Sequence, residues 1–229
     1  MVVYVLGGLI AYLIATKYFK DFNPGDKRVN SDIGHMKEYI ADQCIELVPW
    51  NEQDADLLAF NHQQKVKSVG FGKQIKGHFK SIYQENMFAY AYKEYPGSRS
   101  DRLLLVQTAS HELVYRIKKD IVQIYFDTQP LGHLTEEILY QAGTNKVIGH
   151  IGGAENDMFP IFVAERRIAY INDPKMSKTS VNPRVFNFMI PWTKDEEKIF
   201  LALVFHKIVS FYLPKDKTIK GQAATSLLS

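Results

Sequence analysis

The sequence predicts a mainly β protein, an antiparallel β-barrel that is closed or nearly closed around a hydrophobic C-terminal helix. From residue 88 onward, short segments alternate apolar and polar residues and are separated by turn residues, a pattern typical of sandwiches and barrels. The segment 199–213 is apolar almost all round, and such a helix has to be enclosed. A closed sheet would enclose the helix and would also remove exposed sheet edges.

The first segment is an uncharged run over residues 2–16, which we interpret as part of a transmembrane anchor over residues 1–20. A helix of this length rises about 23 Å, which is short for a membrane span, but Lys17 and Tyr18 can extend it at the interface. The alternative is a buried core helix or strand. Basic residues follow the run and none precedes it, so we expect a single-pass membrane protein whose C-terminal domain is cytoplasmic.

Residues 21–44 are expected to form a linker and a short helix. The segment 23–26, Asn-Pro-Gly-Asp, is a turn signal, and the helix is predicted to start at Ser31. Its apolar face would comprise Ile33, Met36, Tyr39 and Ile40.

The barrel domain is expected over residues 45–213. A short strand over 45–48 and a short helix from Asn51 through Leu58 and Phe60 would come first. No helical pattern long enough for a crossover occurs among the later strands, so antiparallel pairing is expected. Residues 128–130 and similar Gly, Pro, Asn and Asp clusters are interpreted as turns. The strands are predicted over 88–95, 103–108, 113–117, 121–127, 138–141, 146–151, 158–163, 168–171 and 185–190.

Clear start and stop signals bound the central helix, predicted over 194–213. Thr193 and Glu196 have the spacing of a capping box, and Pro214 cannot continue a helix. His206 is interpreted as a hydrogen-bonded core histidine, and Lys207 is expected to extend its ammonium group to the barrel rim. The remaining residues, 214–229, are expected to form a disordered tail.

This order of elements resembles the superfamily of tubby-like and phospholipid-scramblase-like proteins, which have a β-barrel closed around a hydrophobic C-terminal helix. The residues that carry the resemblance are 121–127, 146–151 and 195–213. The tubby-like members imply phosphoinositide binding, and the scramblase-like members imply lipid transfer or membrane association. The chain lacks a palmitoylation cysteine cluster and an acidic calcium loop beside the helix, so calcium-driven scrambling is not carried over.

A charge asymmetry marks the candidate binding site. Five lysines lie between residues 65 and 80, and no acidic residue occurs between Asp56 and Glu85. Apolar residues and glycines alternate with the lysines. We interpret the segment as a site for anionic lipid headgroups or phosphate, and the alternative is a solvated strand or loop face. The candidate residues are Lys65, Lys67, Lys73, Lys76 and Lys80.

No catalytic, metal-binding or cofactor motif is expected. His111-Glu112 is not a zinc motif, because Tyr115 stands where the second histidine would be. A Gly-His-apolar triplet occurs twice, at His133 and His150, and indicates a glycine kink with a rim histidine rather than a metal pair. The single cysteine, Cys44, permits neither an intramolecular disulfide nor a cysteine-based zinc site.

The sequence therefore favours a membrane-anchored β-barrel that binds anionic lipid or a protein partner at the membrane surface. The alternatives are a hydrolase with a histidine and carboxylate site at the barrel rim, and a structural scaffold. The net charge of +3 is too small to imply a nucleic-acid partner. The sequence does not define an oligomeric state.

Overall fold

The computed structural model describes residues 24–49, 52–69, 72–95, 101–175, 182–187 and 190–214. Twelve strands form one sheet in sequence order, and each strand pairs with its neighbours in antiparallel fashion. The strands are β1 (Leu58–Val69), β2 (Gly72–Ser81), β3 (Asn86–Glu94), β4 (Arg102–Gln107), β5 (Glu112–Lys118), β6 (Ile121–Phe126), β7 (Gln129–Thr135), β8 (Ile138–Gln141), β9 (Val147–Ile151), β10 (Met158–Val163), β11 (Arg166–Asn172) and β12 (Phe186–Asn187).

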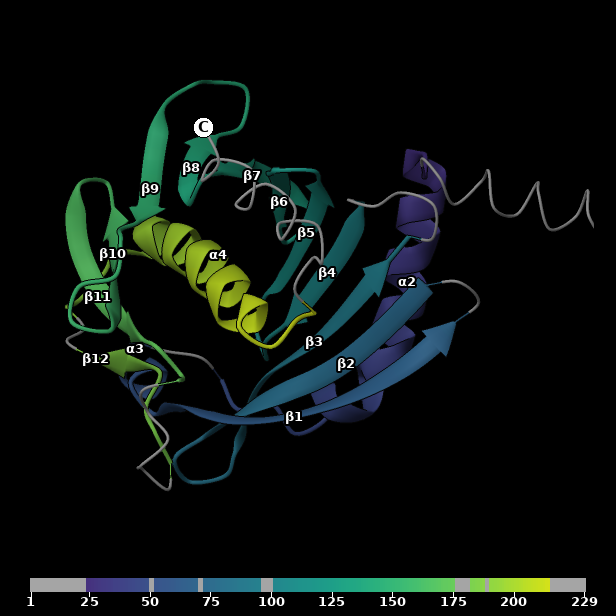
Figure 1. The fold of residues 1–229 in the computed structure, drawn as a ribbon, viewed down its shortest axis with the longest axis horizontal. Coiled ribbons are helices and arrows are strands. Elements are labelled where there is room, and N and C mark those ends of the chain that lie inside the picture. The colour runs from purple at the N-terminus through teal and green to yellow at the C-terminus, as the bar shows by residue number, and fades with distance from the viewer. Residues whose placement is uncertain are drawn as a thin grey trace, which may run out of the picture.

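The sheet curls into a nearly closed barrel around helix α4 (Lys194–Ser210), as Figure 1 shows. The first strand meets the last part of the sheet through two backbone hydrogen bonds. The Phe60 N–H donates to the Pro183 carbonyl and the Val185 N–H donates to the Leu58 carbonyl, both at 2.8 Å. The predicted antiparallel barrel with an internal C-terminal helix is confirmed.

Two-residue turns connect several of the hairpins. At Asp127-Thr128, Glu136-Glu137 and Ala164-Glu165 both residues have positive φ, which is the backbone of a type I′ turn and matches the twist of the flanking strands. The sequence prediction missed β7 because residues 128–130 were all assigned to a turn. The turn uses only its first position, and Pro130 already lies in β7.

Helix α4 begins as predicted and ends earlier than predicted. The Glu196 N–H donates to Thr193 Oγ1 at 3.3 Å and the Thr193 N–H donates to Glu196 Oε2 at 2.8 Å, so the capping box is confirmed. The helix ends at Ser210 rather than at residue 213, and a turn leads to Pro214. Its fully enclosed residues, each 0% exposed, are Phe200, Leu201, Ala202, Leu203, Val204, Phe205, Ile208 and Val209.

Helix α2 (Asp26–Cys44) lies on the outside of the barrel (Figure 1). It begins five residues before the predicted start at Ser31, because the Pro24-Gly25 signal marks the entry to the helix rather than a longer linker. Its buried side chains pack on outward-facing residues of β3, β4 and β5. This outer core contains Val29, Met36, Ile40, Ala89, Ala91, Tyr95, Leu103, Leu105 and Val114.

The segment after α2 also differs from its prediction. Leu47 makes an isolated bridge to Asn86 instead of forming a strand. The next helix, α3 (Glu52–Ala55), is a single turn, and Leu58 and Phe60 already belong to β1. Residues 58–60 therefore form the start of the first barrel strand and not the end of a helix.

Two predicted segments lie outside the described residues: the anchor over 1–20 and the tail, apart from Pro214 itself. Within the described part of the chain, no helix has the length and apolar character needed to cross a membrane.

Candidate functional site

The five candidate lysines lie on the long hairpin of β1 and β2, drawn in blue in Figure 1. Lys65 is paired with Lys76 across the two strands, and Ser68 is paired with Lys73. Val66 is paired with Ile75, which is buried in the barrel core. Because side chains alternate between the faces of a strand, Lys65 and Lys76 lie on the outer face of the barrel and Lys73 lies on the other face.

Lys76 differs from the other candidate lysines because its ammonium group is bound by residues of α2. Its Nζ lies 2.8 and 2.9 Å from the two carboxylate oxygens of Asp42 and 2.9 Å from the Tyr39 carbonyl oxygen. The hydrogen bond from Lys76 lowers the pKa of the Asp42 carboxyl. Lys76 therefore fixes α2 to the barrel, while Lys80 is half-buried near the other end of β2.

The remaining three lysines, Lys65, Lys67 and Lys73, are exposed near the end of the hairpin, where Val69 pairs with Gly72. Val66 is 59% exposed and lies on the same face as Lys73, opposite Lys65 and Lys67. Neither β1 nor β2 contains an acidic residue. We call Lys65, Lys67, Lys73 and Val66 the basic hairpin surface, with Lys65 and Lys67 on the outer face of the hairpin and Lys73 and Val66 on the other face.

A polar network supports the hairpin from inside the barrel, and no motif in the sequence reveals it. The Tyr90 hydroxyl donates to Gln64 Oε1 at 3.1 Å and lies 2.8 Å from His62 Nε2, so His62 is assigned as the donor to Tyr90. Burial lowers the pKa of His62 to about 4. The neutral ring packs against Phe79 and Tyr212, with ring centroids 4.5 and 4.2 Å away.

The histidines considered for a hydrolase lie on separate parts of the sheet. His111 Nδ1 is 2.7 Å from Asp127 Oδ2 beside the turn between β6 and β7. His133 in β7 stacks on Tyr140, and His150 in β9 stacks on Phe162. Within the described residues, no three His, Cys, Asp or Glu side chains form a group that could hold a metal ion.

The Gly-His-apolar triplets have a structural explanation on the barrel wall. A Cβ atom on Gly132 would lie 2.0 Å from the Tyr140 carbonyl oxygen, and one on Gly149 would lie 2.8 Å from the Phe162 carbonyl oxygen. Each glycine also coincides with a register shift in its strand. The glycines permit close backbone approach, and the following histidines stack on aromatic rings.

Two polar side chains near the C-terminal end of α4, His206 and Lys207, differ in their surroundings. Lys207 Nζ reaches Glu137 Oε1 at 2.8 Å, in the turn between β7 and β8. Burial lowers the pKa of His206 to about 4. Its Nδ1 is buried without a hydrogen-bond partner among the described residues, so the expected hydrogen bond is not found at this nitrogen.

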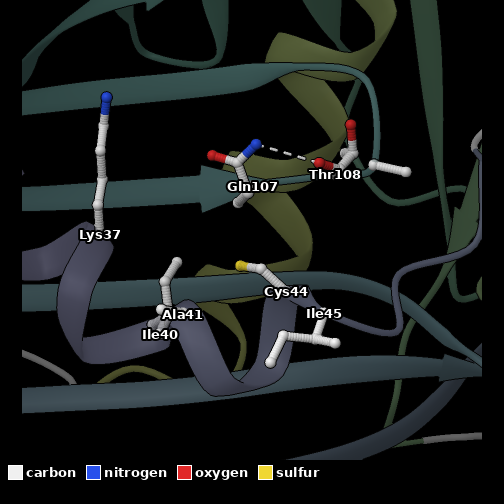
Figure 2. Close-up of a pocket in the computed structure, with 8 residues that line it drawn as sticks. Lys37, Ile40, Ala41, Cys44, Ile45, Gln107 and Thr108 are labelled. Atoms are coloured by element: carbon white, nitrogen blue, oxygen red, sulfur yellow. Dashed lines mark hydrogen bonds between the residues drawn. The ribbon is translucent and has the colours of Figure 1, made fainter.

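Cys44 lies at the C-terminal end of α2, beside the last residues of β4. Figure 2 shows it with Ile40, Ala41 and Gln107 around a pocket of about 380 Å³. Burial, with a smaller contribution from Asp42, raises the pKa of the Cys44 thiol. The thiol form is favoured near neutral pH, and this pocket therefore lacks the thiolate that cysteine chemistry needs.

No protein-family model, curated protein or solved structure matches the chain. The resemblance to the tubby-like and scramblase-like superfamily therefore stays a prediction, and the functional argument depends on the site itself.

Proposed function

We propose that the chain is a membrane-anchored β-barrel whose basic hairpin surface binds anionic lipid headgroups at the cytoplasmic face of a membrane. The observation that carries this proposal is the group of exposed cations Lys65, Lys67 and Lys73 on two strands that contain no carboxylate. The exposed side chain of Val66, on the face of the hairpin that carries Lys73, adds an apolar group that can enter the interfacial region.

The expected strength of this contact is modest. Each lysine near an anionic leaflet contributes about 1 kcal/mol, and the attraction falls off over a Debye length of about 8 Å at physiological salt. Three lysines would therefore orient a domain that is already close to the bilayer. The proposed anchor over residues 1–20 would supply that proximity, because tethering raises the effective concentration of a weak site.

The structure changes which lysines should matter. Lys76 is paired with Asp42 and lies under α2, so its substitution would alter the packing of α2 as well as the surface charge. Lys65 and Lys67 are exposed, and their substitution tests surface charge without breaking an ion pair that the structure describes. The resemblance to tubby-like proteins, which implies phosphoinositide binding, favours the same ligand class.

Vesicle co-sedimentation tests both parts of the proposal. The full chain and a version lacking residues 1–20 would be mixed with phosphatidylcholine vesicles, with or without phosphatidylserine. We expect the full chain to bind both kinds of vesicle and the shortened chain to bind the anionic vesicles alone, with an affinity that falls as salt is raised. Lys65→Glu with Lys67→Glu should lower that affinity by about 2 kcal/mol or more, roughly thirtyfold.

The matched control is Lys146→Glu with Lys198→Glu, which reverses two exposed lysines away from the hairpin, one just before β9 and one near the start of α4. It should leave most of the binding intact if the basic hairpin surface is the site. Equal losses in the two double variants would show a general effect of net charge. Equal binding of the shortened chain to neutral and anionic vesicles, or to neither, would contradict the proposed lipid site.

A further inference from the structure

One edge of β1 has a neighbouring strand at its first residues only. At that end Ala59 bridges to Arg184, and the hydrogen bonds of Leu58 and Phe60 to the segment 183–185 lie beside this bridge. From residue 61 to residue 69, β1 pairs with β2 and with no second strand of the described residues. Figure 1 shows β1 as the outermost strand of the sheet on this side. β1 therefore presents an open sheet edge, and such an edge is a template for an added strand.

The residues along the open edge are exposed on both faces of the strand. All six residues from 63 to 68 are exposed, although each of them is paired with β2 on its other side. They include Gln64 and Val66, which lie on the same face of the sheet as the buried Ile75. The end of the hairpin thus extends past the packed core, and its edge is accessible from both faces.

The backbone groups at the open edge belong to alternate residues of β1. In an antiparallel strand, the N–H and C=O groups of successive residues point to opposite neighbours. Leu58 uses its carbonyl and Phe60 uses its N–H on the side away from β2. From Leu58 to His62, β1 advances four residues while β2 advances two. The two added residues preserve the alternation, because their number is even. The residues whose N–H and C=O groups face the open edge are therefore Gln64, Val66 and Ser68.

The side chains that flank these backbone groups select the charge of an incoming strand. Lys65 and Lys67 lie on the outer face, and neither β1 nor β2 contains a carboxylate. Val66 lies between them on the opposite face and is 59% exposed. Directly opposed side chains on neighbouring strands interact, so acidic residues are favoured opposite the two lysines and an apolar residue opposite Val66. The matching strand therefore alternates acidic and apolar residues.

A second copy of the chain is a poor match for this edge. Two antiparallel copies of β1 related by a two-fold axis at Val66 place Lys65 opposite Lys67 of the second copy. An axis at Lys65 or at Lys67 places that lysine opposite its own equivalent. Like charges directly opposite each other are destabilising, and lysines on edge strands prevent self-association of natural sheets in this way. The edge therefore favours a different chain that carries carboxylates.

We propose that the open edge of β1 binds an extended acidic segment of a partner protein as an added antiparallel strand. Backbone hydrogen bonds to Gln64, Val66 and Ser68 hold the segment, and its carboxylates pair with Lys65 and Lys67. The proposed lipid contact uses the charge of the lysines, whereas strand addition also needs the N–H and C=O groups of this edge. Strand addition therefore goes beyond lipid binding, and the loss of one backbone donor separates the two.

Fluorescence anisotropy of the full chain with a labelled peptide, Thr-Val-Glu-Val-Glu-Val-Thr, tests the proposal. Its valines would lie opposite the residues whose backbone faces the open edge, and its glutamates opposite Lys65 and Lys67. N-methylation of the valines removes the N–H groups that face β1 and should weaken binding by about a hundredfold. N-methylation of the glutamates is the matched control, because their N–H groups face away from β1, and it should leave most of the binding intact.

Ser68→Pro tests the same contact from the side of the protein. It removes one N–H donor from the open edge and keeps the hydrogen bonds between β1 and β2, and proline is tolerated at such positions of edge strands. It should weaken peptide binding by about tenfold and leave binding to anionic vesicles unchanged. Ser68→Ala keeps the N–H group and should bind the peptide like the parent chain. Thermal unfolding would show that each variant is folded, and the N-methylated peptides decide the question if Ser68→Pro does not fold.

Equal binding of the two N-methylated peptides would reduce the contact to charge and overturn the proposal. Absence of saturable binding of the unmodified peptide at millimolar concentration would do the same. A concentration-dependent dimer of the full chain that Ser68→Pro abolishes would assign the edge to a second copy and would also overturn it. Backbone-dependent peptide binding in the absence of vesicle binding would support strand addition and contradict only the lipid proposal.

Discussion

The two long helices are packed in opposite ways, one inside the barrel and one on its outer surface. Helix α4 lies inside the barrel, and eight consecutive or nearly consecutive residues of it are 0% exposed. Helix α2 lies outside, and its buried apolar residues Val29, Met36 and Ile40 form one stripe. An apolar helix gains its stability from enclosure, whereas a surface helix needs one packed face and polar contacts along its edges.

Those polar contacts on α2 are ion pairs with the outer face of the sheet. Asp26 is paired with Arg116, Lys37 with Glu112, and Asp42 with Lys76. One side chain of each pair is exposed and the other is largely covered, and ion pairs that stay in contact with water contribute about 0–1 kcal/mol each. Asp32 differs because it is 3% exposed, lies 2.8 Å from Lys93 Nζ and accepts a hydrogen bond from Tyr95 at 2.9 Å. The helices thus differ in what fixes them. Helix α4 is fixed by enclosure of its apolar residues, with one ion pair near each end, and α2 is fixed by one apolar stripe with several charge pairs along it.

The largest expected effect is the loss of enclosure at α4. Leu203→Ala should lower the free energy of unfolding by about 2–5 kcal/mol, because Leu203 is fully buried and the surrounding barrel cannot collapse onto the space. Urea denaturation of the full chain measures it. Ile45→Ala, just after α2, is the control, since Ile45 is 83% exposed and should change stability by less than about 0.5 kcal/mol. Similar small losses at both positions would place α4 outside the barrel.

The sequence predicted α4 better than α2 because its boundary signals are local. Thr193, Glu196 and Pro214 define the entry and the limit within one segment. The N-cap of α2 is Gly25, which makes no side-chain cap hydrogen bond. Residues 23–26 therefore looked like a turn alone, and the start of the helix was predicted too late, at Ser31. The partners of the first turn are remote, since Asp26 pairs with Arg116 in β5, and no local pattern shows that contact.

The candidate site was predictable to a similar degree. The basic composition of the hairpin is visible in the sequence, because charge runs need no structure to be seen. Which lysine is already neutralised is not visible, because Asp42 reaches Lys76 from a different element. The open edge of β1 is likewise a tertiary feature, because it depends on which strand lies beside β1. The composition of the sequence therefore indicates a basic surface. The contacts of each lysine in the structure decide whether that lysine is free to bind an anion.

The second effect is a pH dependence of the free energy of unfolding, which arises from the buried His206 in α4. Burial, partly opposed by the charge of Glu137, lowers the pKa of His206 from 6.5 to about 4. The unfolded chain therefore binds a proton between these values that the folded chain does not. Stability should be complete above about pH 6.5 and fall as pH drops towards 4, by about 2–3 kcal/mol from this residue.

Unfolding free energies between pH 4 and 7 measure this decline. His62 adds to it in the same window, because its pKa is also about 4. His206→Gln should make the decline shallower, and His35→Gln on the exposed side of α2 should leave its slope unchanged. A slope that His206→Gln does not alter would show that the His206 ring is solvated and that the end of α4 is open to water.

The smallest effects come from adding one methyl group to a glycine that faces α4 and to a glycine within α2. A Cβ atom on Gly149 would lie 2.9 Å from Ile199 Cγ2 and 3.0 Å from Leu203 Cδ1, both on α4, and 2.8 Å from the Phe162 carbonyl oxygen. Gly149→Ala should therefore cost about 1–3 kcal/mol through overpacking. Gly34 lies within α2 with nothing within 4 Å of its Cβ position. Gly34→Ala should instead stabilise the chain by about 0.5–1 kcal/mol, because alanine loses less backbone entropy in a helix.

Urea denaturation of both glycine variants compares the two surroundings directly, since the chemical change is the same and only the neighbours differ. A neutral Gly149→Ala would mean that β9 and α4 can separate without cost, and the barrel would then hold its helix loosely. A destabilising Gly34→Ala would mean that another surface covers this side of α2. Opposite signs for the two substitutions are the result expected when one helix is enclosed by the sheet and the other is packed on its outside.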